Sequence, residues 1–229
     1  MNWKIKACLQ KLLSKSRIGD RVNHLNALMS KDYDFNFVDY HFKEVFRKID
    51  LMNQHNGSTK KDKIALELGT GYFLIEPIIL SLLGFKKIVT VDITPDLKFK
   101  AVKRQIKYLG NDKYLNKIKK NSVLNDIEQK RIFYNLEKAE SLEKIFNICN
   151  IKYIAPYKLD DIEILNLNFD LIFSQVVLEH VPIDKLLDLF KYSKKWLKKT
   201  GLIIHVINFT IILQFQVCGV INLFQNLIF

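Results

Sequence analysis

Short apolar runs alternate with longer stretches of helical periodicity along most of this sequence. Five of the runs have the length and composition of buried strands: Ile64–Leu68, Lys87–Ile93, Ile151–Ile154, Phe169–Gln175 and Gly201–Ile207. Continuous apolar runs of a few residues, separated by helices, are typical of parallel strands that are covered on both faces. The pattern therefore predicts an α/β fold with a doubly wound, mostly parallel sheet.

The segments between these runs predict the helices. One helix is expected near residues 36–52, another from the glycine turn at Gly69–Gly71 to about Leu83, and a third over Lys185–Leu197. The lysine-rich stretch from Asp96 to about Asn150 predicts two or three more helices as an insertion between strands 2 and 3. We expect a helical cap over residues 1–60, which ends in the polar turn Asn53–Lys63, and a main domain over residues 61–229. Candidate core contacts of the cap are Phe35, Phe37, Tyr40, Phe42, Val45, Phe46 and Ile49.

The net charge of +12 raises the question of a nucleic-acid partner. Only five of the 36 basic residues are arginines, whereas base reading and bidentate phosphate contacts favour the guanidinium group. Lysine is spread over the whole chain with no nucleic-acid motif, so nucleic-acid binding is disfavoured. The charge is better explained by a compositional bias.

The cysteines indicate a reducing compartment. Cys8, Cys149 and Cys218 are far apart, and none has a second cysteine or a histidine at metal-ligand spacing. The first 17 residues lack the apolar run and the small-residue cleavage site of a signal peptide. We therefore expect a cytoplasmic protein with no metal site.

The most informative local motif is the glycine turn in ALELGTGYF. Gly69 and Gly71 follow the first strand, so the backbone can approach a ligand closely where the next helix begins. A dinucleotide fingerprint requires a third glycine three residues after Gly71, but this position is Leu74, and NAD or FAD is disfavoured. Glu67, two residues before the first glycine, indicates a different cofactor.

Asp92 stands at the end of the second strand, 21 residues after Gly71. A carboxylate at this place can accept hydrogen bonds from both hydroxyls of a ribose, which fits an adenosine cofactor. The alternative is an acidic turn residue before Pro95.

Three segments, ALELGTG, VTVDI and FDLIFSQVVLEHV, together resemble the motifs of class I S-adenosylmethionine (SAM)-dependent methyltransferases, the methyltransferase type 11-like domains in particular. The resemblance covers about residues 64–207. It implies a Rossmann-like sheet of order 3-2-1-4-5 and SAM lying over the carboxyl ends of strands 1, 2 and 4.

The resemblance also assigns cofactor contacts. It implies that Glu67, Gly69, Thr70 and Gly71 hold the methionine part, that Asp92 and Ile93 hold the ribose and adenine, and that Ser174 and Gln175 form the floor of the site. Asp160 and Asp161 are both candidates for the acid that meets the adenine amino group. The chain departs from the family pattern at Phe73, which replaces a glycine.

Two histidines are candidate general bases. His180 follows the fourth strand within the segment LEHV, and His205 lies in the otherwise apolar fifth strand. Histidine takes up a proton near neutral pH, so either can act on a substrate. The alternatives are a packing or positioning role for His180 and a core position for His205.

The stretch from Val206 to Phe229 has no charged residue. Its glutamines and asparagines argue against a membrane span, and alternation around Phe215 favours a hairpin that turns at Cys218–Gly219 and can serve as an interface. The helix expected before such a hairpin is missing, which suggests a shortened member of the family as the other explanation.

These features predict a SAM-dependent methyltransferase acting on oxygen or nitrogen of a small molecule or a glycan or lipid precursor. A non-catalytic or truncated protein with the SAM fold is one alternative. Methylation of RNA or DNA is the other, but residues 174–177 lack the Asn/Asp-Pro-Pro-aromatic motif of many enzymes that methylate amino groups.

Overall fold

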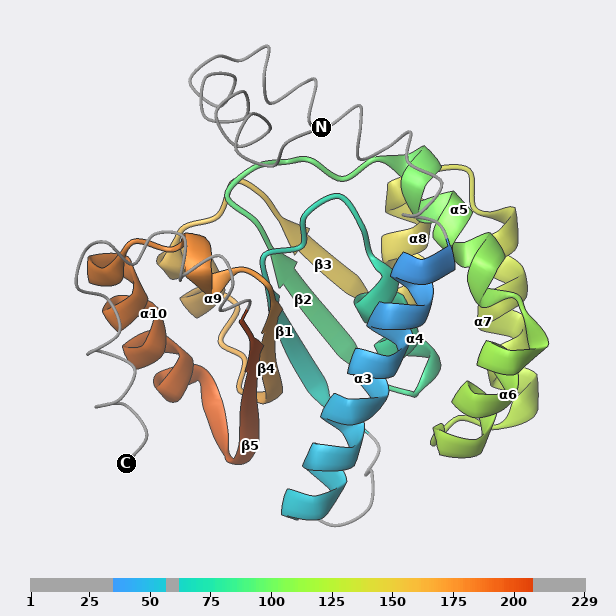
Figure 1. Ribbon diagram of the computed structural model, residues 1–229, viewed down its shortest axis with the longest axis horizontal. Helices are drawn as coiled ribbons and strands as arrows, with labels where there is room; N and C mark the ends of the chain where they lie inside the picture. The colour runs from blue at the N-terminus through green and yellow to red at the C-terminus, as the bar shows by residue number, and fades with distance from the viewer. Residues whose placement is uncertain (1–34, 57–61, 208–229) are drawn as a thin grey trace, which may run out of the picture.

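A computed structural model describes residues 35–56 and 62–207, so the expectations for the first 34 residues and for the hairpin after residue 207 lie outside the described residues. Within these ranges the chain forms a five-stranded parallel sheet of order β3-β2-β1-β4-β5 (Figure 1). The strands are β1 (Ile64–Leu68), β2 (Lys87–Val91), β3 (Ile151–Ile154), β4 (Phe169–Gln175) and β5 (Leu197–Val206). The α/β class and the strand order are as predicted.

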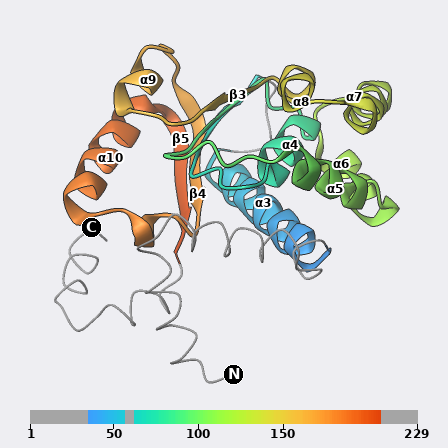
Figure 2. The same ribbon diagram turned by 90° about the horizontal axis from the view of Figure 1, so that it is seen from above.

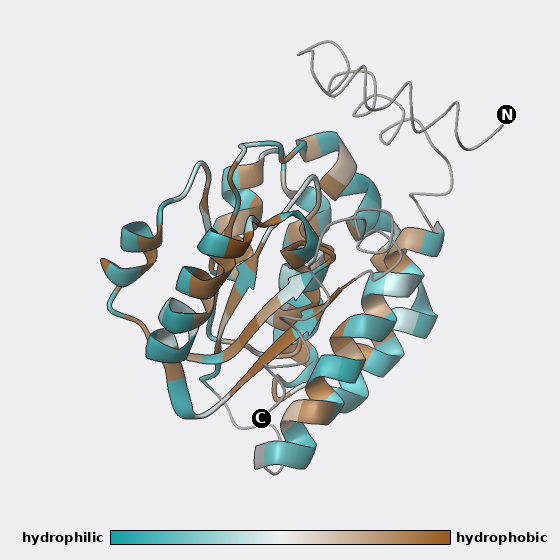
Figure 3. Cartoon of the chain, turned by 60° about the vertical axis from the view of Figure 1, so that its left-hand side comes forward, coloured by the Kyte–Doolittle hydropathy of each residue, from teal (hydrophilic) through white to brown (hydrophobic). Residues whose placement is uncertain are grey.

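Two layers of helices cover the sheet (Figure 2). Alternate residues of β1 serve the two layers: Ala65 belongs to one apolar core, whereas Leu66 and Leu68 belong to the other. On the first face lie α3 (Phe35–Asn56), α4 (Ile75–Leu82), α5 (Phe99–Leu109), α6 (Asp112–Asn121), α7 (Asp126–Lys138) and α8 (Leu142–Cys149); on the second lie α9 (Leu159–Glu163) and α10 (Ile183–Trp196). Figure 3 shows hydrophobic residues on the central strands and hydrophilic residues on the outer turns of the helices.

The insertion between β2 and β3 contains four helices, α5 to α8, where the sequence pattern predicted two or three. Side-chain caps explain the additional break. Asn111 accepts a hydrogen bond from the Lys113 N–H, Ser141 accepts one from the Lys144 N–H, and Asn125 forms a reciprocal capping box with Glu128. Each cap starts a new helix within a stretch whose apolar periodicity looks continuous.

Helix α3 extends beyond the predicted residues 36–52 at both ends and packs against α4. The prediction of its buried face is confirmed for Phe42, Val45, Phe46 and Ile49. Tyr40 is an exception, because 43% of its surface is exposed. Its ring lies at the rim of a cavity instead of in the core.

Strand β5 begins at Leu197, four residues before the predicted start at Gly201. The sequence Lys198-Lys199-Thr200 concealed this first part of the strand because a charged run usually indicates a loop. In the structure Lys198 Nζ donates to Asp170 Oδ2 on the adjacent strand at 2.8 Å.

No helix within the described ranges is long and apolar enough to cross a membrane.

Candidate functional site

A cavity of about 740 Å³ opens where β1, β2 and β4 end, and α3 and α4 form its other wall. This is the edge at which open parallel sheets bind ligands. Among the described residues the lining comprises Phe37, Tyr40, His41, Glu67, Leu68, Gly69, Thr70, Gly71, Tyr72, Phe73, Ile75, Glu76, Asp92, Ile93, Tyr157, Gln175, Val176, Val177, His180, Val181 and Leu189.

The glycine turn forms the floor of the cavity after β1. Gly69 has a φ of +81° and Gly71 a φ of +62°, a region that side chains disfavour. The N–H groups of Gly69 and Thr70 both donate to the Val91 carbonyl at the end of β2, at 2.8 and 3.2 Å. A Cβ on Gly69 would lie 2.4 Å from Val177, whereas a Cβ on Gly71 would meet nothing within 4 Å. Gly69 is therefore needed for packing, and Gly71 leaves open space for a ligand.

Asp92 joins the glycine turn to the end of β2. Its carboxylate accepts hydrogen bonds from the Gly71 N–H at 2.6 Å and from the Thr94 N–H at 3.1 Å. Each carboxylate oxygen has a second lone pair, so the group retains the capacity to accept ribose hydroxyls. Ile93 follows with 74% of its surface exposed, although it is a large apolar residue.

Glu67 is buried near the end of β1, with 6% of its surface exposed. Thr90 on β2 donates a short hydrogen bond to its carboxylate, and the Thr90 hydroxyl also contacts that of Thr70. Burial, reinforced by the negative charge of Glu76, raises the pKa of Glu67 to about 8. Glu67 is therefore largely protonated at neutral pH in the absence of a bound cation.

The chain turns sharply after β4. Val176 has a φ of +55°, which is strained for a β-branched residue, and its N–H donates to the Val206 carbonyl at 2.8 Å. This turn carries Val177 over Gly69. The short 3₁₀ helix η2 (Leu178–His180) follows and brings His180 to the cavity lining.

Two of the predicted site residues, Ser174 and His205, do not reach the cavity. Ser174 is completely buried, and its hydroxyl shares a 2.8 Å hydrogen bond with Nδ1 of His205 on β5. Burial lowers the pKa of His205 to about 4, so its imidazole is neutral at physiological pH. His205 is half-buried on β5 and lies outside the cavity lining, and only Gln175 of the predicted floor lines the cavity.

The predicted acids after the third strand also lie outside the cavity. Asp161 accepts a hydrogen bond from the Lys158 N–H at 2.7 Å and caps α9, and Asp160 is exposed in the first turn of the same helix. The residue that does reach the cavity from this segment is Tyr157, whose N–H donates to the Asp92 carbonyl at 3.0 Å. Asp160 and Asp161 follow the end of β3 by several residues and belong to α9, so they lie away from the edge of the sheet where the cavity opens.

Comparisons with known proteins give the following similarities. Neither a family model nor a curated protein matches the sequence. The structure resembles a mutant of MtNAS in complex with S-adenosylmethionine, with 13% identity, 88% of this chain and 55% of that chain covered, and a TM-score of 0.39. It also resembles the magnesium protoporphyrin IX methyltransferase ChlM from Synechocystis PCC 6803 with bound SAH, with 10% identity, coverage of 78% and 64%, and a TM-score of 0.39. The chain spans less than two thirds of each of these two proteins.

Sequence reasoning missed the polar residues that α3 and α4 bring to the cavity. Tyr40 and His41 on α3 and Glu76 on α4 line it, and the buried Lys48 lies behind them. Glu76 interrupts an apolar stretch of α4, which is the signal that a sequence can give for a buried charge, whereas Lys48 lies between Arg47 and Ile49-Asp50 and gives no such signal. Their pairing depends on how α3 packs, and no local pattern encodes it.

Proposed function

We propose that the chain binds SAM in this cavity and transfers its methyl group to an acceptor that enters beside α3. The observation that carries the proposal is the convergence of Glu67, the Gly69–Gly71 turn, Asp92 and Ile93 around one cavity. These residues come from β1 and β2 and the loops that follow them, at the edge where parallel sheets bind nucleosides.

The chemistry of the cavity fits each part of the cofactor. Asp92 offers acceptor lone pairs for the ribose hydroxyls. The exposed side chain of Ile93 and the ring of Tyr157 offer apolar surface for adenine, and Glu67 offers a carboxylate for the cationic amino-acid part. The open space above Gly71 lets the cofactor approach the backbone.

SAM, when bound, supplies a methyl group on a sulfonium leaving group. The chain's own residues then align the acceptor with this methyl and exclude water. Phe37, Tyr72 and Phe73 contribute apolar rings to the lining and support the exclusion of water. A small molecule with an O–H or N–H group is the acceptor that these surroundings favour.

Calorimetric titration of the full chain with SAM and with its demethylated product, S-adenosylhomocysteine (SAH), tests the proposal. We expect micromolar binding of both and a loss of at least about tenfold in Asp92→Asn, because the substitution removes a charge-assisted acceptor. Asp160→Asn is the matched control, since Asp160 is exposed and outside the cavity, and its affinity should equal that of the wild type. A folded wild-type chain that binds neither compound would favour a non-catalytic protein with this fold.

A further inference from the structure

A chain of polar contacts runs from α3 across the inner end of the cavity. Lys48 Nζ donates to Glu76 Oε2 at 2.8 Å and to Gln175 Oε1 at 3.0 Å, and Gln175 Nε2 donates to Tyr40 Oη at 2.6 Å. The second carboxylate oxygen of Glu76 lies 2.7 Å from Nδ1 of His41. The side chains of Lys48 and Glu76 are each 1% exposed, which makes the pair a fully buried one.

The ionisation state of the Glu76 carboxyl determines which ring nitrogen of His41 can accept a proton from a substrate. Burial alone would raise the pKa of Glu76, but the hydrogen bond from His41 and the charge of Lys48 outweigh it and hold the pKa below its ordinary value. An ionised carboxylate only accepts hydrogen bonds, so Nδ1 of His41 carries the proton and donates it to Glu76. Nε2 is then the nitrogen that can take up a second proton, and the carboxylate stabilises the resulting imidazolium.

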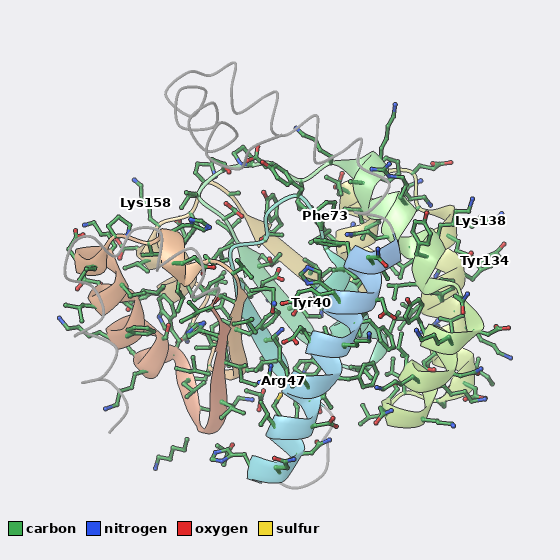
Figure 4. The ribbon with its side chains drawn as sticks, in the orientation of Figure 1. Tyr40, Arg47, Phe73, Tyr134, Lys138 and Lys158 are labelled. Atoms are coloured by element: carbon green, nitrogen blue, oxygen red, sulfur yellow. The ribbon has the colours of Figure 1, made fainter. Side chains whose placement is uncertain are left out.

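Aromatic rings surround His41 at the cavity. The Phe37 ring centroid is 4.2 Å from that of His41 and 4.5 Å from that of Phe73, and the Tyr40 ring stands edge-on to His41 at 5.3 Å. Figure 4 labels Tyr40 on α3 and Phe73 in the loop after β1. All four residues line the cavity. Offset and edge-to-face contacts of this kind favour a flat aromatic ligand.

We propose that the methyl acceptor is an aromatic hydroxyl and that Nε2 of His41 takes up its proton; this inference rests on the proposed function. In the reaction the phenolic oxygen forms a bond to the methyl carbon, and the bond from that carbon to the sulfur breaks with its electron pair going to sulfur. The hydroxyl proton passes to His41, and the products are an aryl methyl ether, SAH and an imidazolium that returns the proton to solvent.

A carboxylate acceptor fits this wall of the cavity poorly. Methylation of a carboxylate needs no base, and the binding of a carboxylate requires a cation. No lysine or arginine is among the described residues that line the cavity, whereas Glu67, Glu76 and Asp92 are. Lys48 lies behind the lining and already donates to Glu76 and Gln175. A neutral hydroxyl group avoids the repulsion that the Glu76 carboxylate beside His41 imposes.

His41 is a better base than the other candidates at the cavity. Tyr40 already accepts a hydrogen bond from Gln175, and burial, with the nearby charge of Glu44, raises the pKa of Tyr40. His180 is exposed, and no hydrogen bond between its ring and a carboxylate occurs among the described residues. His180 is therefore the rival base, and His55, exposed in the last turn of α3 and outside the cavity lining, is the matched control. Glu76 is a positioning residue, because it acts only through His41.

The test uses 4-nitrophenol as the probe and the SAH-loaded full chain, at a pH where the free probe is mostly neutral. Proton transfer to His41 should produce the absorption band of bound nitrophenolate. We expect the band to fall at least tenfold in His41→Asn and to persist in the control His55→Asn. In Glu76→Gln the band should decrease, because the neutral amide stabilises the imidazolium less. Nitrogen-15 spectra of the histidine rings in the wild type provide a second measurement, in which Nε2 of His41 gains a proton when the probe binds.

The outcomes separate this inference from the proposed function. A folded chain that does not bind SAH refutes the proposed function and, with it, this inference. Binding of SAH without binding of 4-nitrophenol, or binding of the probe in its neutral form, refutes only the aromatic hydroxyl and the role of His41. A nitrophenolate band that survives in His41→Asn and disappears in His180→Asn would assign the proton to His180. If His41→Asn does not fold, the nitrogen-15 spectrum of the wild type decides between these results.

Discussion

Binding of SAM should release a proton from Glu67. The pKa of this buried carboxyl is raised to about 8, so the unliganded chain carries it mainly in the protonated form at neutral pH. The proposed cofactor brings an ammonium and a sulfonium group, and an ionised carboxylate pairs with these cations far better than a neutral one. The complex therefore favours loss of the proton.

The size of the effect follows from this pKa. A group with a pKa of 8 is ionised to about 3% at pH 6.5 and to about 24% at pH 7.5, so affinity should rise about eightfold over this interval, or ~1.2 kcal/mol. The interval ends there because an α-amino group loses its own proton near about pH 8. Stability of the unliganded chain changes in the opposite direction: the contribution of Glu67 is fully present below its ordinary pKa of 4.5 and is lost as the pH rises through about 8.

Calorimetry at pH 6.5 in buffers of different ionisation enthalpy measures the proton directly. The wild type should release close to one proton on binding SAM. Glu67→Gln should release none, and its affinity should be constant across the interval. Glu143→Gln, a change at an exposed carboxylate on α8 outside the cavity, should behave as the wild type. Proton release that persists in Glu67→Gln would refute the assignment.

Three further substitutions test other parts of the structure. Gly69→Ala should destabilise the chain by roughly 1–3 kcal/mol in urea unfolding, because its Cβ would lie 2.4 Å from Val177; an unchanged urea midpoint would contradict this packing. Lys48→Met should cost about 3–5 kcal/mol of stability by leaving Glu76 buried without its cation, and adding Glu76→Gln should restore much of the loss in the same assay. Ile93→Ser should weaken SAH binding about five- to tenfold with no change in the urea midpoint, because the side chain is exposed until adenine covers it.

Much of the sheet could be predicted because its strands are short apolar runs with clear ends. The bounds of β1, β3 and β4 agree with the sequence prediction, since β1 stops before Gly69, β3 stops before Ala155-Pro156 and β4 stops at the polar Gln175. The start of β5 could not be predicted, because the pairing of Lys198 with Asp170 depends on the adjacent strand. The points at which α6, α7 and α8 begin could have been predicted, since asparagine and serine at a helix start are local signals.

The residues of the site also fall into two groups, those that the sequence predicted and those that it could not. Glu67, Gly69 and Asp92 come together because their positions at strand ends follow from the order of the sheet, and sequence reasoning found them. His41 and Glu76 are 35 residues apart and meet only because α3 packs on α4. Contacts between helices on one face of a sheet have no spacing rule in the sequence. Such residues are found only when the tertiary packing is known.

Helix α3 supplies one wall of the cavity, although it precedes the whole sheet in the chain. Selection can therefore act on the two halves of the cavity separately. Substitutions confined to the exposed and cavity-facing positions of this one helix, such as Phe37 and Tyr40, leave every strand and the glycine turn unchanged. Under the proposed function, new acceptors can be acquired in evolution, or introduced by design, through changes at a few cavity-facing positions of this single helix.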